Sequence, residues 1–316
     1  MASVAKNPSS VAVIDIGSNS IKLLVATRDA AGRVVTLKTQ TIDARISAGI
    51  SHAAPRLTAD SMALGLGAVE TLLASAAAFA PVRIQLVATS AVRDAANGPE
   101  FRETVRRATG HEIHILTGDE EAAGIGRGLT CDPALADLQD FYVFDLGGGS
   151  LECLAFRARL PLEEISLQLG CVRLTERFIG NSSDPLSAES LAQISAHTKA
   201  TLGAFSFALG NVPAIGTGGT VTTVRAILGA RHGLPFEQTP STVTVPQLRE
   251  LLAFIAPLSL AQRQQVPAMP AARADVFPAA LATLIAVAEA GGLTEFRHSL
   301  YNLRYGLATR LLDSCT

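Results

Sequence analysis

The sequence predicts an α/β fold built from two similar halves, and three observations support this prediction. Residues 13–26 (VIDIGSNSIKLLVA) and 143–156 (VFDLGGGSLECLAF) read almost as copies of one strand, turn and strand segment. A third glycine-rich turn, within residues 214–228 (AIGTGGTVTTVRAIL), follows an apolar run and opens a helical pattern. Between these turns, strand-like runs alternate with helix-like segments, as in α/β domains. We therefore expect two domains that face one another across a phosphate-bearing ligand.

Each copy of the repeat predicts a β-hairpin whose turn can bind an anion. An apolar run, 11–16 or 141–146, contains an aspartate near its end and is followed by residues that tolerate positive φ and then by a second apolar run. Such a turn can present several backbone N–H groups as a concave nest. The alternative is two ordinary hairpins with Asx-type turns. One short glycine motif is weak evidence for an anion site, but its repetition argues against this alternative.

The third turn predicts a different anion site, at a helix N-terminus. There the helix dipole favours phosphate, and backbone and hydroxyl donors are at hand. Across the three turns, the predicted phosphate-binding residues are Gly17, Ser18, Asn19, Ser20, Gly147, Gly148, Gly149, Ser150, Gly218, Gly219 and Thr220.

The remaining elements follow in chain order from hydrophobic periodicity and capping signals. The first half predicts a strand at 34–42, a helix from its N-cap Thr58 to about residue 79, and then a strand at 83–88, a helix at 99–109, a strand at 112–116 and a helix from residue 119. The second half repeats the opening hairpin and then predicts helices at 187–209, after Pro246, and at 303–312.

Composition limits the partners and the compartment. The chain has 316 residues, of which 48% are hydrophobic, so it can bury two cores. A net charge of −2 gives no bulk attraction to nucleic acid or to anionic membranes. Four cysteines without C-x-x-C spacing, and an N-terminus that lacks an export signal, predict reduced thiols in the cytoplasm. The longest apolar stretch, residues 276–288, is too short to span a bilayer.

The two hairpin turns and the strand-to-helix turn resemble the actin, sugar kinase and heat-shock chaperone ATPase superfamily. The resemblance implies two actin-like (ribonuclease H-like) domains with a cleft between them. Within that superfamily, ATSAVRDAAN at 88–97, GDEEA at 118–122 and DLGGGSLE at 145–152 resemble the exopolyphosphatase and guanosine pentaphosphate phosphohydrolase family, as does RADVFPAAL at 273–281. The resemblance runs over nearly the whole chain. We expect the short form of the family, without the C-terminal His-Asp domain that longer family members carry.

The repeated turns and the absence of a long low-complexity linker predict two domains joined by a short hinge. We expect an N-terminal domain at residues 1–128 and a C-terminal domain at 129–316, with a short hinge near 125–135 that closes when substrate binds. The last helix, from about residue 303, is expected to pack on the first domain. The family's S-x-x-G-L-R-x-G motif reads SLYNLRYG here, so Asn302 replaces a glycine and the local backbone is expected to differ.

The family match also implies the catalytic residues. Glu121, the second glutamate of G-D-E-E, is the expected general base, and Arg93 is the expected phosphate-binding arginine. Neighbouring glutamates on a helix point about 100° apart, so only Glu120 or Glu121 can readily face the substrate. The alternatives are a capping box from Thr117 to Glu120 with first-turn acids, and a salt bridge between Arg93 and Asp94. Lys22 and Arg45 are weaker phosphate-binding candidates.

Three carboxylates are the expected ligands of a divalent cation. Asp15 and Asp145, at the ends of the two first strands, can hold Mg²⁺ because this hard cation takes oxygen ligands. Asp145 and Glu152 also match the family's metal-binding carboxylates. The expected cofactor is Mg²⁺, with Mn²⁺ as the alternative.

The leading hypothesis is a magnesium-dependent phosphohydrolase that releases terminal phosphate from inorganic polyphosphate or guanosine pentaphosphate by attack of water. A phosphotransferase and a noncatalytic polyphosphate or nucleotide sensor are the alternatives. The presence of Glu121, Asp145 and Glu152 argues against the sensor. We expect no nucleic acid or membrane partner, and a homodimer is left open.

Overall fold

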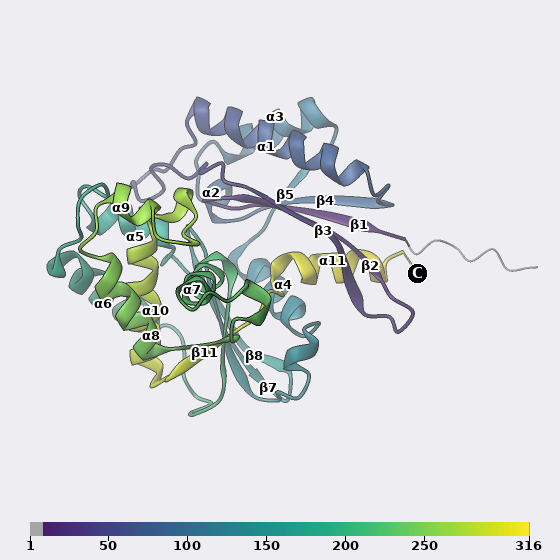
Figure 1. The fold of residues 1–316 in the computed structure, drawn as a ribbon. Coiled ribbons are helices and arrows are strands. Elements are labelled where there is room, and N and C mark those ends of the chain that lie inside the picture. Colours follow the sequence, from purple (N-terminus) through teal and green to yellow (C-terminus); the bar gives the residue numbers. More distant parts are fainter. Residues whose placement is uncertain (1–8, 316) are drawn as a thin grey trace, which may run out of the picture. The chain divides into compact units, whose positions relative to one another are not determined.

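The computed structural model describes residues 9–315, which divide into two compact units (Figure 1). The first unit comprises the described residues up to Ala48, Arg56–Ala136, and the segment from Tyr301 onward. The second unit comprises Gly49–Pro55 and Asp137–Leu300. The main transition therefore lies between residues 136 and 137, later than the predicted boundary after residue 128.

The first unit is built on a five-stranded mixed sheet with the strand order β3-β2-β1-β4-β5. The outer hairpins are antiparallel, whereas β1, β4 and β5 are parallel, as crossover helices require. The strands are β1 (Val11–Ile16), β2 (Ile21–Arg28), β3 (Val34–Ile42), β4 (Arg83–Ala88) and β5 (Ile113–Ile115). All five match the predicted strands closely, because each is an apolar run bounded by turn residues.

Helices cover both faces of this sheet, with α1 and α3 on one side and α4 and α11 on the other (Figure 1). Thr58 caps α1 as predicted, since its hydroxyl accepts the N–H of Ser61 at 3.0 Å. The helices are α1 (Ala59–Ala77), α2 (Ser90–Arg93), α3 (Gly98–Thr109), α4 (Gly118–Leu129) and α11 (Leu303–Asp313), with a 3₁₀ turn η1 (Pro133–Leu135).

Close packing between α4 and α11 ties the end of the chain to the first unit. A Cβ on Gly306 would collide with the carbonyl of Gly124, and one on Gly128 with the carbonyl of Asn302. The backbone at position 302 does not require glycine, because its φ is −154°. The side chain of Asn302 caps α11 by accepting the N–H of Arg304. The substitution at this motif position therefore supplies a helix cap.

The second unit contains a six-stranded sheet with the order β10-β11-β9-β6-β7-β8. Its opening hairpin, β6 and β7, is antiparallel, and β9 runs parallel to β6, which repeats the arrangement of β1, β2 and β4. The strands are β6 (Phe141–Leu146), β7 (Leu151–Arg157), β8 (Leu160–Leu167), β9 (Ala214–Thr217), β10 (Thr242–Thr244) and β11 (Glu295–His298). The sequence repeat is thus a repeat of structure.

The helices of the second unit centre on α10, which packs against α5, α6, α7 and α8. The apolar stretch at residues 276–288 lies buried here, and no helix among residues 9–315 is long and apolar enough to cross a membrane. The helices are α5 (Cys171–Phe178), α6 (Ala188–Leu202), α7 (Gly218–Arg231), α8 (Val245–Ile255), α9 (Leu260–Gln264) and α10 (Phe277–Gly291), with 3₁₀ turns η2 (Phe236–Gln238) and η3 (Ala271–Arg273).

The predicted helix at 187–209 was too long, because α6 ends at Leu202. The chain then turns so that Phe205 and Phe207 meet Tyr142 and Phe144 in edge and stacked contacts with ring centroids 5.5–6.2 Å apart. The hydroxyl of Tyr142 accepts the N–H of Leu209 at 2.7 Å. Burying these aromatic rings outweighs continuing the helix.

His298, at the end of β11, forms a buried titratable site against α7. Its Nε2 lies 3.0 Å from the Thr222 hydroxyl, and its Nδ1 lies 3.4 Å from a guanidinium nitrogen of Arg225. Burial, together with the positive charge of Arg225, lowers the pKa of His298 from 6.5 to about 4. The folded protein therefore holds this imidazole neutral.

We expect acid to destabilise the protein through His298. Between pH 6.5 and 4 the unfolded chain binds a proton that folded His298 does not, so stabilisation present above pH 6.5 is lost as the pH falls toward 4. The free energy of unfolding should fall by roughly 3 kcal/mol over this range from His298 alone. Urea titrations at several pH values should show a shallower pH dependence for His298→Gln. An identical slope for His298→Gln and the wild type would contradict the assignment, and the exposed His232→Gln is the control.

Candidate active site

The first glycine turn joins β1 to β2 and closes on itself. The N–H of Gly17 donates to the carbonyl of Ser20 at 3.2 Å, and the Ser18 hydroxyl lies 3.1 Å from that of Ser90 at the start of α2. The side chains of Ser18, Asn19 and Ser20 are buried. Among residues 9–315, no protein acceptor meets the backbone N–H groups of Ser18 and Asn19. Within the described residues, these N–H groups are left open to an anion.

The loop after β3 wraps the first turn and fixes its orientation. The N–H groups of Arg45 and Ser47 donate to the carbonyls of Asn19 and Ser18 at 3.0 and 3.3 Å, and Arg45 Nε donates to Asn19 Oδ1 at 3.1 Å. In a trans peptide the N–H points opposite to the carbonyl. The N–H groups of Asn19 and Ser20 therefore point away from this loop. Arg45 supports the turn in this structure.

The second glycine turn, between β6 and β7, closes in the same way, with the Gly147 N–H donating to Ser150 at 3.0 Å. The carbonyls of its three glycines face α5. Those of Gly147 and Gly148 accept N–H groups of α5 at 3.0 and 2.8 Å, and that of Gly149 accepts Arg173 Nε at 3.0 Å. By the same peptide geometry, the N–H groups that follow these carbonyls point away from α5. Within the described chain, those of Gly148 and Gly149 donate to no protein acceptor.

The third turn lies beside the second in the same unit. Strand β9 pairs with β6 so that Thr217 is opposite Asp145, and α7 begins at Gly218. Gly218 has φ +85°, and a Cβ there would collide with the Asp145 carboxylate, so this position requires glycine. The hydroxyl of Thr220 donates to the carbonyl of Leu146 at 3.2 Å. Because that hydroxyl is occupied, Thr220 can offer an anion only its backbone N–H.

Glu121 and Arg93 form an ion pair in the first unit. Arg93 Nη1 donates to Glu121 Oε2 at 2.8 Å and to the carbonyl of Leu116 at 3.1 Å, and its Nε lies 3.5 Å from Asp94 Oδ1. Glu121 is only 7% exposed, although it lies in the first turn of α4. The predicted base is thus a buried carboxylate whose orientation is fixed by the predicted phosphate-binding arginine.

Glu120 serves a different purpose from its neighbour. It forms the capping box of α4, since its carboxylate accepts the N–H of Thr117 at 2.8 Å while the Thr117 hydroxyl accepts the N–H of Glu120 at 3.1 Å. This backbone hydrogen bond, aided by His114, lowers the pKa of Glu120. The two glutamates therefore differ in their contacts: Glu120 caps the helix, whereas Glu121 pairs with Arg93.

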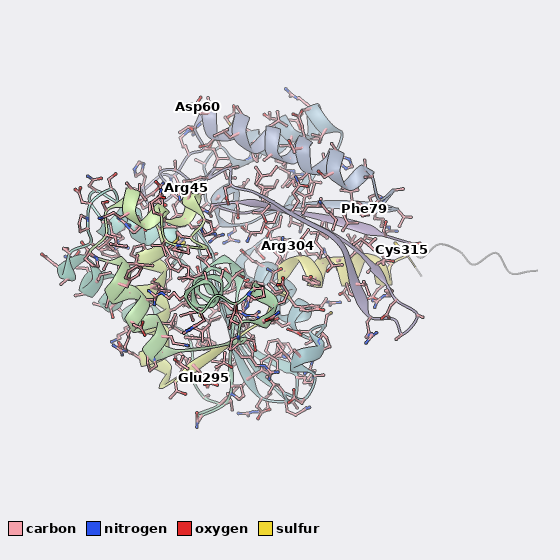
Figure 2. The ribbon with its side chains drawn as sticks, in the orientation of Figure 1. Arg45, Asp60, Phe79, Glu295, Arg304 and Cys315 are labelled. Atoms are coloured by element: carbon pink, nitrogen blue, oxygen red, sulfur yellow. The ribbon has the colours of Figure 1, made fainter. Side chains whose placement is uncertain are left out.

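The predicted metal-binding carboxylates lie in both units. In the second unit, Asp145 and Glu152 are direct partners across β6 and β7, and Glu152 Oε1 accepts the Ser166 hydroxyl at 2.8 Å. In the first unit, Asp15 has a buried Oδ1 without a hydrogen-bond partner. Burial raises the pKa of Asp15, while Lys22 opposite it on β2 and Arg304 at the start of α11 (Figure 2) lower it. An orphaned buried oxygen is the kind of atom that a cation or its bound water satisfies.

Comparison with known proteins decides the family. A profile described as the Ppx/GppA phosphatase family matches residues 24–315. The chain belongs to this family.

Relatives and solved structures agree with the Ppx/GppA assignment. Proteins named guanosine-5'-triphosphate,3'-diphosphate pyrophosphatase from Aeromonas hydrophila and Aeromonas salmonicida are each 30% identical over 306 residues. These alignments cover 96% of this chain but only 59% of each relative. An exopolyphosphatase structure from Cytophaga hutchinsonii has a TM-score of 0.87 at 22% identity, covering 97% of this chain and 98% of that one. The structure of the Aquifex aeolicus Ppx/GppA family member has a TM-score of 0.79 at 23% identity, and the match covers 98% of this chain and 99% of that one. The predicted α/β class is confirmed, because each of the two units is built on a mixed sheet with helices.

One residue near the third turn was not predicted as a site residue. The guanidinium of Arg273, in η3, lies against Gly219 at the N-terminus of α7, where a Cβ would collide with it. Among residues 9–315 its side chain has no hydrogen bond or ion pair with protein. Its positive charge therefore adds to that of the helix N-terminus, which favours anions. The quoted RADVFPAAL motif begins with this residue, but periodicity alone gives no reason to place it near α7.

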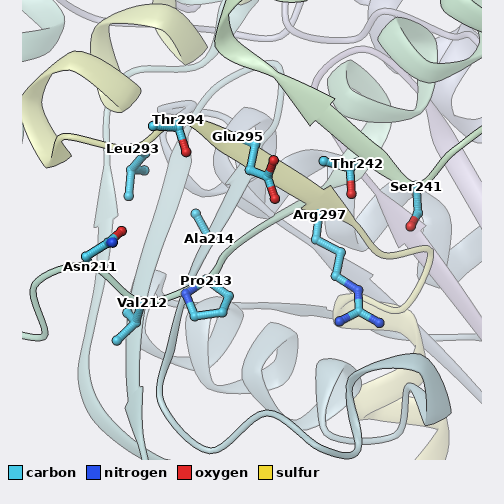
Figure 3. A pocket seen from close by; sticks show the side chains of 10 residues that line it. All are labelled: Asn211, Val212, Pro213, Ala214, Ser241, Thr242, Leu293, Thr294, Glu295 and Arg297. Carbon is cyan, nitrogen blue, oxygen red and sulfur yellow. The ribbon is translucent and has the colours of Figure 1, made fainter.

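A pocket of about 600 Å³ lies elsewhere in the second unit (Figure 3). Its lining comes from residues 211–214, which lead into β9, from Ser241 and Thr242 at the start of β10, and from residues 293–295 and Arg297, which lead into and include part of β11. The second and third glycine turns follow the carboxyl ends of β6 and β9, whereas Ala214, which lines the pocket, is the first residue of β9. It contains none of the predicted site residues.

Proposed function

We propose that this chain is a phosphohydrolase that removes terminal phosphate from inorganic polyphosphate or guanosine pentaphosphate. The observation that carries the proposal is the buried Glu121, held at 2.8 Å by Arg93. A glutamate withdrawn from solvent and oriented by a cation is suited to take a proton from an attacking water. Membership of the Ppx/GppA phosphatase family supports the reaction class, and the names of its relatives supply the two substrates.

The proposed reaction divides its tasks among the chain's own residues. Open N–H groups of the glycine turns bind non-bridging phosphate oxygens, and Arg273 adds a positive charge at the third turn. Glu121 accepts a proton as the water oxygen attacks the terminal phosphorus. The bond from that phosphorus to the bridging oxygen breaks, and the shortened chain leaves with the bonding electrons. Positioning and electrostatic stabilisation supply most of the catalysis in such phosphoryl transfers.

The carboxylates fit a magnesium ion that shares its coordination with substrate. Among the described residues, no cluster of three or more His, Cys, Asp or Glu side chains forms a complete metal site. Mg²⁺ needs none, because it keeps several waters and is commonly held by one or two carboxylates and phosphate oxygens. Asp145 and Glu152, which are partners across β6 and β7, would hold the ion. It would neutralise charge on the leaving phosphate; Mn²⁺ is the alternative.

Asp145→Asn tests the metal assignment. Replacing a charged oxygen ligand with a neutral one should raise the Mg²⁺ concentration needed for half-maximal activity by about tenfold or more. The measurement is phosphate release across a Mg²⁺ titration. Ser166→Ala, which removes only the hydrogen bond to Glu152, should produce a smaller shift. An unchanged Mg²⁺ titration for Asp145→Asn would remove Asp145 from the metal site.

The function itself is tested by phosphate release from polyphosphates of several lengths, guanosine pentaphosphate, GTP and ATP, each with Mg²⁺ and with a chelator. We expect release from polyphosphate or guanosine pentaphosphate that stops when the chelator is added. Loss of terminal phosphate only when a sugar or other acceptor is present would identify a phosphotransferase. Tight binding without turnover of any substrate would identify a sensor.

A further inference from the structure

The largest completely buried side chain in the described part of the molecule is an arginine. Arg263, in α9, has an exposure of 0%. Among residues 9–315 no carboxylate forms an ion pair with it, and its guanidinium instead donates to four backbone carbonyls. These belong to Leu258 at 3.2 Å, Ala274 at 3.2 Å, Ser182 at 2.7 Å and Asp184 at 2.8 Å. Withdrawal from water lowers the pKa of Arg263, with Asp275 acting in the opposite direction.

A cation buried in this way is costly, and the cost is offset only where every N–H finds an acceptor. Apolar residues of similar volume often stabilise a core equally well. What the arginine adds is geometry, because its planar fork fixes the positions of several carbonyls at once. The four acceptors come from the segment between α5 and α6, from the residue before the N-cap of α9, and from the residue after η3.

The contact with η3 connects Arg263 to the third glycine turn. Ala274, whose carbonyl accepts Arg263 Nη1, directly follows Arg273. The turn is short and is closed by the Arg273 N–H donating to Pro270 at 2.9 Å. The guanidinium of Arg273 reaches from this turn to the backbone of Gly219. A shift of the turn would therefore move that guanidinium away from the N-terminus of α7.

We propose that Arg263 is a positioning residue for the substrate: it fixes η3 so that the Arg273 guanidinium faces the phosphate bound at the N-terminus of α7. The inference rests on the proposed function, in which that phosphate belongs to the substrate. Arg263 never touches substrate and acts only through Arg273. Its effect must therefore vanish when Arg273 is absent.

A double-mutant cycle tests this requirement. Tripolyphosphate is the probe, and kcat and KM are measured for the wild type, Arg263→Lys, Arg273→Ala and the double variant. Lysine keeps the charge but cannot reach four carbonyls. Arg273→Ala should raise KM by about 10- to 100-fold, the loss of one charge-assisted contact. Arg263→Lys should raise KM by a smaller factor, and the double variant should match Arg273→Ala within about twofold.

Additive effects would overturn the inference. If Arg263→Lys raises KM by the same factor with and without Arg273, or lowers only kcat and thermal stability, Arg263 serves the fold alone. Tripolyphosphate affinity is measured by calorimetry in the same cycle, so the cycle can be read even without turnover. Absence of hydrolysis by the wild type would reject the proposed function, whereas additivity rejects only the role of Arg263.

Two further variants separate positioning from general destabilisation. Arg225→Lys is the matched control, because Arg225 also donates to backbone carbonyls but holds η2 and the residue after it, which carry no site residue. It should leave KM within about twofold of the wild type. Should Arg263→Lys fail to fold, Pro270→Gly loosens η3 while leaving Arg263 and its acceptors in place. It should raise KM only when Arg273 is present, and a full effect with Arg273→Ala would contradict the proposal.

Discussion

Glu121→Gln should lower turnover by about 10²- to 10⁴-fold, the usual cost of losing a general base. Glutamine keeps the size of the side chain and an oxygen that can accept from Arg93, so folding and substrate binding should be nearly unchanged. The measurement is kcat for phosphate release, with KM and the melting temperature recorded on the same preparation. A fall in kcat with an unchanged melting temperature separates lost chemistry from lost structure.

The matched control is the neighbouring glutamate. Glu120→Gln retains a capping box, because glutamine can also accept the N–H of Thr117, so activity should stay within about twofold of the wild type. The two variants differ by one position on the same helix turn and remove the same charge. Turnover of Glu121→Gln within about twofold of the wild type would move the base to another residue, with Glu120 the first to examine.

Local signals predicted most of the fold. The hairpins at residues 11–28 and 141–157, the strand-to-helix turn at Gly218 and the start of α1 at Thr58 are set by apolar runs, glycine and capping residues within a few positions. Such short-range preferences can be predicted from a single sequence. The end of α6 could not be predicted in this way, because it depends on contacts between Phe205 and the aromatic side chains of β6.

The candidate site divides in the same way. Glu121, Arg93 and the glycine turns belong to contiguous motifs, so family resemblance placed them. The support of Arg45 for the first turn and the approach of Arg273 to Gly219 join segments that are far apart in the chain. Buried Arg263 gave no signal, since an arginine in a polar helix is ordinarily exposed. Long-range packing, which decides these contacts, has no period or spacing in the sequence.

Gly170→Ala should abolish most activity through the second glycine turn, although Gly170 itself is not a predicted phosphate ligand. It precedes α5, and a Cβ there would collide with the backbone of Gly148 and Gly149. Backbone cannot yield as a flexible side chain can, so the turn must shift. A displacement of about 1 Å in a positioning element can cost roughly 100-fold in rate. We expect at least that loss in kcat/KM, with a destabilisation of roughly 1–3 kcal/mol.

Gly180→Ala is the control, since Gly180 is exposed, lies just after α5 and has open space where a Cβ would be. Its unfolding free energy should change by no more than about 0.5 kcal/mol and its activity hardly at all. Phosphate release and urea denaturation measure both variants. The decisive comparison is between activity and stability. If the turn binds substrate phosphate, the fall in kcat/KM of Gly170→Ala should be far larger than its modest loss of unfolding free energy can explain. If Gly170→Ala keeps near-wild-type kcat/KM while losing stability, the carbonyls of the turn anchor α5 and its N–H groups do not hold the substrate.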